Sequence, residues 1–227
     1  MLTPVQIGFL VFPHVTQLDL MGPAQVLSRV PGAKVHLAWK SITPLMTDVG
    51  FTINPTVSFE QSPQFDVLCV PGGAGVVEQL SDDETLAFLR TQGQAARYVT
   101  SVCNGSLLLG AAGLIDGYKS ACHWMWRHYL PQFGAQPVAA RVVRDRNRLS
   151  GAGVTSGIDF AFSLAEELAG GEVARMIQLG LEYDPQPPFD CGSPEKAGAE
   201  RVARARSAQE AFLKDVDVHV ARAASRR

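Results

Sequence analysis

The sequence predicts one α/β domain in which a mostly parallel sheet is covered by helices on both faces. Short apolar runs alternate with helical patterns along the chain, and this alternation is typical of such a fold. The run from Asp66 to Val70 is almost wholly apolar, as expected for a strand buried on both faces of a parallel sheet. No internal repeat or long linker divides the 227 residues, so we expect a single domain over 1–227.

The N-terminal part is predicted to contain two strands, Gln6 to Phe12 and Val35 to Trp39, because both runs are rich in large apolar residues. Between them a helix is expected from Ala24 to Val30, with Pro23 near its first turn. The segment from Leu45 to Phe59 alternates weakly and contains glycine and proline, which indicates a hairpin or an edge excursion.

The central part repeats the order of strand, turn and helix. After the strand at 66–70 and a glycine-rich loop, a helix is expected from about Asp82 to Ala96. Ser81 or Asp82 is its predicted cap, and acidic residues fill the first turn, where the helix dipole favours them. The β-branched run Tyr98 to Val102 predicts the next strand, and Gly105 to Ala112 the helix that follows it.

The last third is predicted to be a hairpin followed by helices. The hairpin joins Val138–Val143 to Arg148–Gly151, and two helices are expected at Ser156–Leu168 and Glu172–Tyr183. A proline-rich stretch at 185–194 then leads to a charged C-terminal helix from about Glu195 to Ala224. This helix is too short to form a second domain.

Composition excludes several classes of partner. The formal net charge is −2 and no basic stripe is visible, so nucleic acid is not an expected partner. Arg222, Arg226 and Arg227 cluster at the C-terminal end and are interpreted as a solvated tail. No signal-peptide pattern and no apolar stretch of about eighteen residues is present, so we expect no membrane contact and a cytoplasmic location.

The cysteines and histidines do not predict a metal centre. The four cysteines, Cys69, Cys103, Cys122 and Cys191, are scattered without CxxC spacing, and the five histidines form no ligand cluster. Cys69 lies inside an apolar run, as expected for a cysteine that acts as a small hydrophobic residue. We therefore expect no metal.

Cys103 stands out because a β-branched strand meets a helix at this residue. The sequence SVCNGS at 101–106 places small residues two and three positions after the cysteine, which allows a tight turn. This pattern predicts a nucleophile elbow, in which a strained turn projects the side chain from the carboxyl edge of the sheet. A helix N-terminus favours the thiolate, which is the reactive form, so we expect Cys103 to have a lowered pKa.

Two further features support a site at this edge of the sheet. The loop PGGAG at 71–75 follows a buried parallel strand, and ligands bind outside the carboxyl ends of such strands. The amides of Gly72 and Gly73, with the backbone amide of Asn104, could hold a developing negative charge, although the loop could equally be a plain tight turn.

Asp19 lies in an apolar stretch after the first strand, where an unpaired carboxylate is costly. It is either a helix cap or a proton donor and acceptor beside the thiol. His123 could complete a Cys-His-acid triad, but a packing or pocket-lining role is favoured, and whether His123 or Cys122 lines the site stays open.

These motifs resemble the superfamily of PfpI-type peptidases and class I glutamine-amidotransferase-like proteins. The resemblance covers LDLMGP at 18–23, PGGAG at 71–75, SVCNGS at 101–106, GAAGL at 110–114 and HW at 123–124. Within this superfamily the chain is most similar to isocyanide (isonitrile) hydratases, through segments such as VHLAWK at 35–40, ARYVTSVC at 96–103 and LEYDPQPPF at 181–189.

The resemblance implies a flavodoxin-like homodimer that hydrates an isocyanide without a cofactor. It places Cys103 at the position of the nucleophile and Asp19 at the position of the acid, where many relatives outside the hydratase branch have glutamate. Hydratases of this type usually have threonine after the nucleophile, whereas this chain has Asn104. That difference concerns rate and substrate preference more than reaction class.

Other functions are possible for the same residues. Some branches of the superfamily use this thiol and acid on α-oxoaldehydes, as glyoxalases or deglycases. A low-pKa cysteine could also be a redox sensor without enzymatic activity. A peptidase is less favoured because no histidine partner can be assigned to Cys103. AraC-type regulators are disfavoured because the segment after Pro194 is too short for their DNA-binding region.

Overall fold

A seven-stranded sheet forms the centre of the computed structural model, which describes residues 4–226. The strand order is β10-β11-β7-β6-β1-β2-β5, and all neighbouring pairs are parallel except β10 with β11. The strands of this sheet are β1 (Val5–Leu10), β2 (Ala33–Trp39), β5 (Val57–Ser58), β6 (Val67–Val70), β7 (Tyr98–Val102), β10 (Val142–Asp145) and β11 (Arg148–Gly151). The predicted flavodoxin-like α/β sandwich is therefore confirmed.

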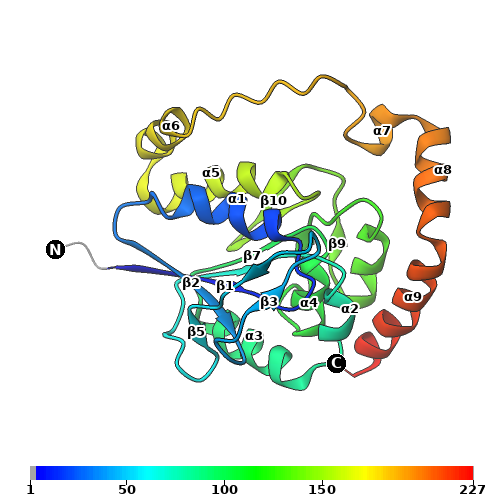
Figure 1. The fold of residues 1–227 in the computed structure, drawn as a ribbon, viewed down its shortest axis with the longest axis horizontal. Coiled ribbons are helices and arrows are strands. Elements are labelled where there is room, and N and C mark those ends of the chain that lie inside the picture. Colours follow the sequence, from blue (N-terminus) through cyan, green and yellow to red (C-terminus); the bar gives the residue numbers. More distant parts are fainter. Residues whose placement is uncertain (1–3, 227) are drawn as a thin grey trace.

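Helices cover both faces of this sheet, as Figure 1 shows. On one face lie α1 (Gln17–Leu27), α5 (Ser156–Ala169) and α6 (Gly171–Gly180), and α5 packs against both of the others. The other face is covered by α2 (Val76–Gln79), α3 (Asp83–Ala95), α4 (Gly105–Ala111) and the 3₁₀ helix η1 (Arg127–Phe133). Strands β6 and β7 are buried at every position because they lie between these layers.

Two small sheets lie beside the main one. Strands β3 (Leu45–Met46) and β4 (Thr52–Ile53) form the antiparallel hairpin expected within 45–59, and β5 at the end of that segment joins the edge of the main sheet. Strands β8 (Lys119–Ser120) and β9 (Gln136–Pro137) pair in parallel and were not predicted. The predicted hairpin around 145–147 is present as β10 and β11.

The first helix differs from the prediction. It begins at Gln17, seven residues earlier than expected, so that Asp19 lies in its first turn and Pro23 lies inside it. A proline without an N–H group cannot donate to the carbonyl four residues earlier, which here belongs to Asp19. The predicted cap of α3 is confirmed, because Asp82 Oδ1 accepts a hydrogen bond of 2.8 Å from the Thr85 N–H group.

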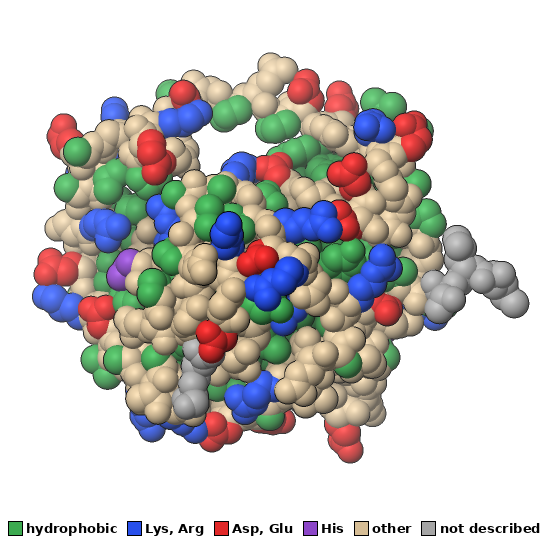
Figure 2. Space-filling view, turned by 180° about the vertical axis from the view of Figure 1, so that it is seen from behind, with side chains coloured by type: hydrophobic (Ala, Val, Ile, Leu, Met, Phe, Trp, Pro, Cys, Tyr) green, Lys and Arg blue, Asp and Glu red, His purple; other side chains and the backbone are tan. Residues whose placement is uncertain are grey.

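The C-terminal region also differs from the prediction. Instead of one helix there are three, α7 (Pro194–Ala197), α8 (Ala199–Ala208) and α9 (Glu210–Ser225), because Gly198 adopts a φ of 82° and the chain breaks again at Gln209. The exposed linker from α6 to α7 spans the molecule and leaves an opening between itself and the body (Figures 1 and 2).

Helix α9 is docked on the body through an apolar stripe. Val216, Val220 and Ala223 are buried, and Asp217 accepts a hydrogen bond of 2.6 Å from the Tyr129 hydroxyl group. Arg222 and Arg226 are exposed, as predicted for a solvated tail, and Arg226 forms an ion pair of 2.6 Å with Asp83. Arg227 lies outside the described residues. Within residues 4–226, no helix is long and apolar enough to cross a membrane.

Candidate active site

Cys103 lies on the turn between β7 and α4, with a left-handed φ of 59°. Few residues other than glycine adopt this conformation, which costs of the order of 1–3 kcal/mol and persists only where the surroundings fix it. Two backbone hydrogen bonds fix the turn, since the Cys103 N–H group donates to the Gly151 carbonyl (3.2 Å) and its carbonyl accepts from the His123 N–H group (3.3 Å). The Ser106 hydroxyl group also donates to this carbonyl at 3.4 Å. The geometry is that of the predicted nucleophile elbow.

The turn is tight because glycine lets two backbone segments approach closely. A Cβ atom on Gly105 would lie 2.3 Å from the Val70 carbonyl oxygen and 2.5 Å from that of Pro71. A Cβ atom on Gly72 would lie 2.8 Å from the Cys103 Cβ atom. The glycine loop and the elbow are therefore in direct contact, as expected for loops at the carboxyl ends of neighbouring strands.

Asp19 reaches this edge of the sheet from the first turn of α1. Its side chain is buried, and Oδ2 accepts a hydrogen bond of 2.8 Å from the Gly72 N–H group. Oδ1 is also buried and has no hydrogen bond to any of the residues that the structure describes. The carboxyl group interacts with the side chain of Cys103, so the structure brings the predicted thiol and the predicted acid together.

Burial dominates the ionisation of this pair. Burial, with the nearby charge of Asp48, raises the pKa of Asp19 to about 7, against the lowering effect of the Gly72 N–H group. Burial and the charge of Asp19 raise the pKa of the Cys103 thiol well above its usual range, although the Asn104 amide lowers it. The prediction of a lowered thiol pKa is therefore wrong for the protein without substrate. Burial and the Asp19 charge raise the pKa of Cys103 by more than the helix N-terminus lowers it.

The coupled pair loses its first proton near pH 7 and keeps its second to much higher pH. In the state with one proton the negative charge lies mainly on the Asp19 carboxylate, because its pKa is the lower of the two, and transfer of the thiol proton to Asp19 gives the thiolate form. The thiolate form leaves Asp19 as a neutral acid beside the nucleophile. This arrangement suits a reaction that needs a nucleophile and a proton donor at one point.

The two glycine amides are already used by side chains. Gly72 donates to Asp19, and Gly73 donates to Asn104 Oδ1 at 2.8 Å. Neither amide is free to bind a developing negative charge unless one of these bonds opens. The anion-binding role of Gly72, Gly73 and the Asn104 amide stays a prediction, while the closed loop is an observed property of the site.

His123 and Cys122 lie next to the elbow without forming a triad. Burial lowers the pKa of His123, and its Nδ1 atom accepts a hydrogen bond of 3.3 Å from the Met125 N–H group. Burial raises the pKa of Cys122 to about 12, and its charge would interact with that of Cys103. The favoured packing role of His123 agrees with these contacts. Cys69 is fully buried in β6 with a pKa raised to about 12 by desolvation, as expected for an inert thiol.

Two contributions to the site were not foreseen from the sequence. Gly151, at the end of β11, supplies the carbonyl that fixes the elbow. Asp48, in the loop of the β3–β4 hairpin, is held by a hydrogen bond of 3.1 Å from its N–H group to the Val15 carbonyl. The hairpin was predicted, but no local pattern indicated that its tip approaches Asp19.

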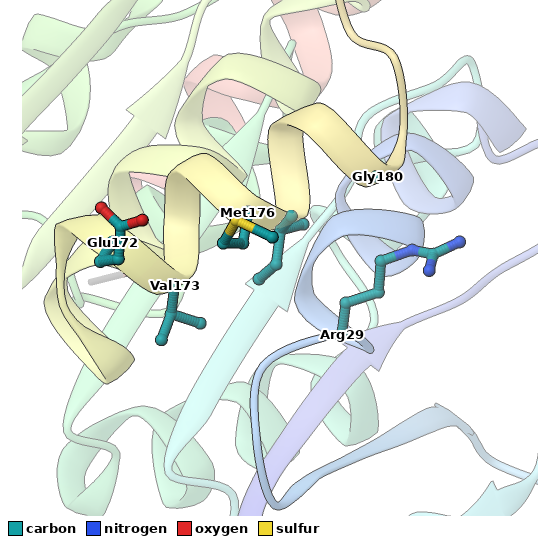
Figure 3. Close-up of a pocket in the computed structure, with 6 residues that line it drawn as sticks. Arg29, Glu172, Val173, Met176 and Gly180 are labelled. Carbon is teal, nitrogen blue, oxygen red and sulfur yellow. The ribbon is translucent and has the colours of Figure 1, made fainter.

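No group of three or more metal-ligating side chains is present within residues 4–226. The groove in Figure 3 lies between α6 and the end of α1, where Arg29, Glu172 and Met176 line it. Its residues differ from those around Cys103, and it does not bring together groups suited to catalysis. The elbow with Asp19 therefore remains the candidate active site.

A buried carboxyl beside a cysteine on a strand-to-helix elbow, within a flavodoxin-like sandwich, defines a class of α/β proteins. The chain belongs to the DJ-1/PfpI family, whose model matches residues 5–167. It is 52% identical over 210 residues to a protein of Pseudomonas putida named isonitrile hydratase, covering 92% of each chain.

Further similarities extend over the fold. A crystal structure of a ThiJ/PfpI family protein from Pseudomonas syringae superposes with a TM-score of 0.93 at 45% identity, covering 96% of this chain and 91% of the other. A protein of Thermococcus kodakarensis named as a deglycase is 28% identical over 135 residues, which is 59% of this chain and 81% of that protein.

Proposed function

We propose that this protein is an isocyanide hydratase, which adds water to R–N≡C to give an N-substituted formamide. The supporting observation is that Asp19 and Cys103 both lie against Gly72 at the elbow, in a chain 52% identical to a protein named isonitrile hydratase. The exposed fraction of Cys103 is 8%, which favours a substrate with a narrow reactive end. The linear head of an isocyanide, with its reactive carbon at the tip, meets this requirement.

In the proposed mechanism the sulfur of Cys103 attacks the terminal carbon of the isocyanide. The S–C bond forms as Asp19 delivers its proton to that carbon, which gives the thioimidate R–N=CH–S–Cys103 and leaves Asp19 as a carboxylate. Division of one difficult hydration into addition and hydrolysis is the general advantage of covalent catalysis.

In the second half of the cycle, the Asp19 carboxylate accepts a proton from water as the oxygen attacks the thioimidate carbon. The C–S bond then breaks, a proton moves to nitrogen, and R–NH–CHO leaves while the Cys103–Asp19 pair recovers its one proton. The Gly72 N–H group holds the carboxylate between these steps. The cycle consumes water and isocyanide only, so it requires no cofactor.

The test is to incubate the purified protein with a small isocyanide and to follow the formamide, with methylglyoxal as a parallel substrate. We expect catalytic formamide production and no comparable loss of methylglyoxal. Consumption of methylglyoxal without hydration of any isocyanide would instead support a glyoxalase-like or deglycase-like enzyme. Absence of both activities, with reversible oxidation of Cys103, would support a thiol redox sensor.

We also propose that the chain acts in the cytoplasm as a homodimer. The resemblance to isocyanide hydratases supports the dimer, and the free cysteines, Cys69, Cys103, Cys122 and Cys191, suit a reducing compartment. Light scattering is expected to give twice the chain mass of 24.4 kDa. A mass equal to that of one chain over the full concentration range would contradict the dimer.

A further inference from the structure

The side chain of Asn104 does not cap its own helix but binds the backbone of the glycine loop at Gly73. Asn104 is the N-cap residue of α4, where asparagine normally accepts a hydrogen bond from the first turn of its own helix. Here it makes no such bond. Instead Oδ1 accepts from the Gly73 N–H group at 2.8 Å and Nδ2 donates to the Gly73 carbonyl at 3.1 Å. The side chain is buried, so these bonds are shielded from water.

These two bonds hold Gly73, and its neighbour Gly72 donates the hydrogen bond to the Asp19 carboxylate. Gly73 has a φ of 139°, a conformation that glycine can leave at little cost. Three backbone bonds also hold this loop: the Thr16 N–H group donates to the Gly72 carbonyl (2.9 Å), the Val76 N–H group to the Gly73 carbonyl (3.3 Å) and the Gly75 N–H group to the His14 carbonyl (3.4 Å). The Gly73 N–H group is held by Asn104. A bidentate contact fixes both the place and the orientation of a peptide group, which a single hydrogen bond does not.

We propose that Asn104 is a positioning residue, whose side-chain amide locks Gly73 so that the Gly72 N–H group stays on the Asp19 carboxylate beside Cys103. The side chain of Asn104 does not touch the reacting atoms in this assignment. It acts through the peptide of Gly72 and Gly73. A Cβ atom on Gly72 would lie 2.3 Å from Asn104 Oδ1, which shows how closely the amide is fitted against the loop.

The consequence for the pair follows from the charges around Asp19. The Gly72 N–H group lowers the pKa of Asp19, while burial and Asp48 raise it. Cys103 is the thiol that interacts with Asp19, and Cys122 in turn interacts with Cys103. His123 also lies next to the elbow, and burial lowers its pKa. If the loop loosens, the carboxylate loses its hydrogen bond and keeps the groups that destabilise it. The first proton of the pair is then lost at higher pH.

The test measures the pH dependence of Cys103 alkylation by iodoacetamide, in a Cys191→Ser background because Cys191 is exposed. We expect the wild-type rate to rise through an inflection near pH 7, and Asp19→Asn to remove that inflection. In Asn104→Leu, which keeps the size of the side chain without its hydrogen bonds, the inflection should move up by about one pH unit. Asn104→Thr, whose hydroxyl group can replace one of the two bonds, should give a smaller upward shift.

Gln92 on α3 provides a matched control. It is buried and holds the loop before β6 in the same way, accepting from the Phe65 N–H group (2.9 Å) and donating to the Pro63 carbonyl (3.1 Å). This contact lies at the opposite end of β6 from Gly72. Gln92→Leu should lower the melting temperature and leave the inflection where it is in the wild type.

An unshifted inflection in Asn104→Leu, with a melting temperature lowered as in Gln92→Leu, would assign Asn104 a structural role and overturn the proposal. If Asn104→Leu does not fold, an unshifted inflection in Asn104→Thr overturns it equally. The inference rests on the proposed roles of Cys103 and Asp19, but the test uses no isocyanide. A protein without hydratase activity that still shows the shift would contradict the proposed function and leave the positioning role intact.

Discussion

Replacement of Cys103 with alanine is expected to abolish isocyanide hydration while leaving the fold intact. The sulfur atom forms the bond to the substrate in the proposed mechanism, and no other thiol occupies the elbow. Removal of a covalent nucleophile typically costs at least about 10³-fold in turnover, and the same is expected here. The measurement is the rate of formamide formation by the purified variant, with circular dichroism to establish that it is folded.

Cys69→Ala is the control for this variant. Cys69 is also buried and its pKa is raised to about 12, but it lies within β6 rather than on the elbow. It should lower stability slightly and keep the wild-type turnover. Hydration that survived in Cys103→Ala would disprove the covalent mechanism, whatever the behaviour of Cys69→Ala.

Replacement of Asp19 with asparagine is expected to lower turnover by about 10²- to 10⁴-fold, the range typical for loss of a general acid or base. The amide oxygen can still accept from the Gly72 N–H group, so the loop should stay in place. Cys103 should remain alkylatable, because the thiol itself is unchanged. Wild-type turnover in Asp19→Asn would mean that the carboxyl group stabilises the start of the helix and takes no part in the reaction.

The same variant should be more stable than the wild type at neutral pH. The pKa of Asp19 is about 7 in the folded protein and near 3.8 when unperturbed, so the folded state retains a proton that the unfolded chain has released. The free energy of unfolding therefore falls as pH rises between these values, by an amount on the order of 4 kcal/mol. Urea denaturation of both proteins below pH 4 and above pH 7 should show the difference appear with rising pH.

The sequence predicted the fold well where local pattern and burial agree. The apolar run at Asp66 to Val70 and the β-branched run at Tyr98 to Val102 are both buried strands of the sheet. The start of α1 was misplaced because Gly22 and Pro23 indicate a helix boundary, whereas tertiary packing against α5 extends the helix through them. Local propensity is a weak guide where packing supplies more free energy.

The site was predicted in its residues but not in its electrostatics. The turn at Cys103 and the apolar surroundings of Asp19 are visible in the sequence, and both point to chemistry. The pKa of the thiol depends on burial and on a carboxylate that is 84 positions away in the chain, which local pattern does not encode. For the same reason the sequence predicted that the Gly72 and Gly73 N–H groups could bind an anion. In the structure they donate to Asp19 and Asn104 instead.

The docked helix α9 has a practical consequence for anyone who trims or recombines this protein. The family model matches only residues 5–167, yet Val216 and Val220 are completely buried against elements within that range. A truncation at the boundary of the family match would expose the apolar surface of α4 and η1, and such surfaces promote aggregation. Expression fragments, chimaeras and mutant libraries of this chain should therefore retain the segment through Arg226.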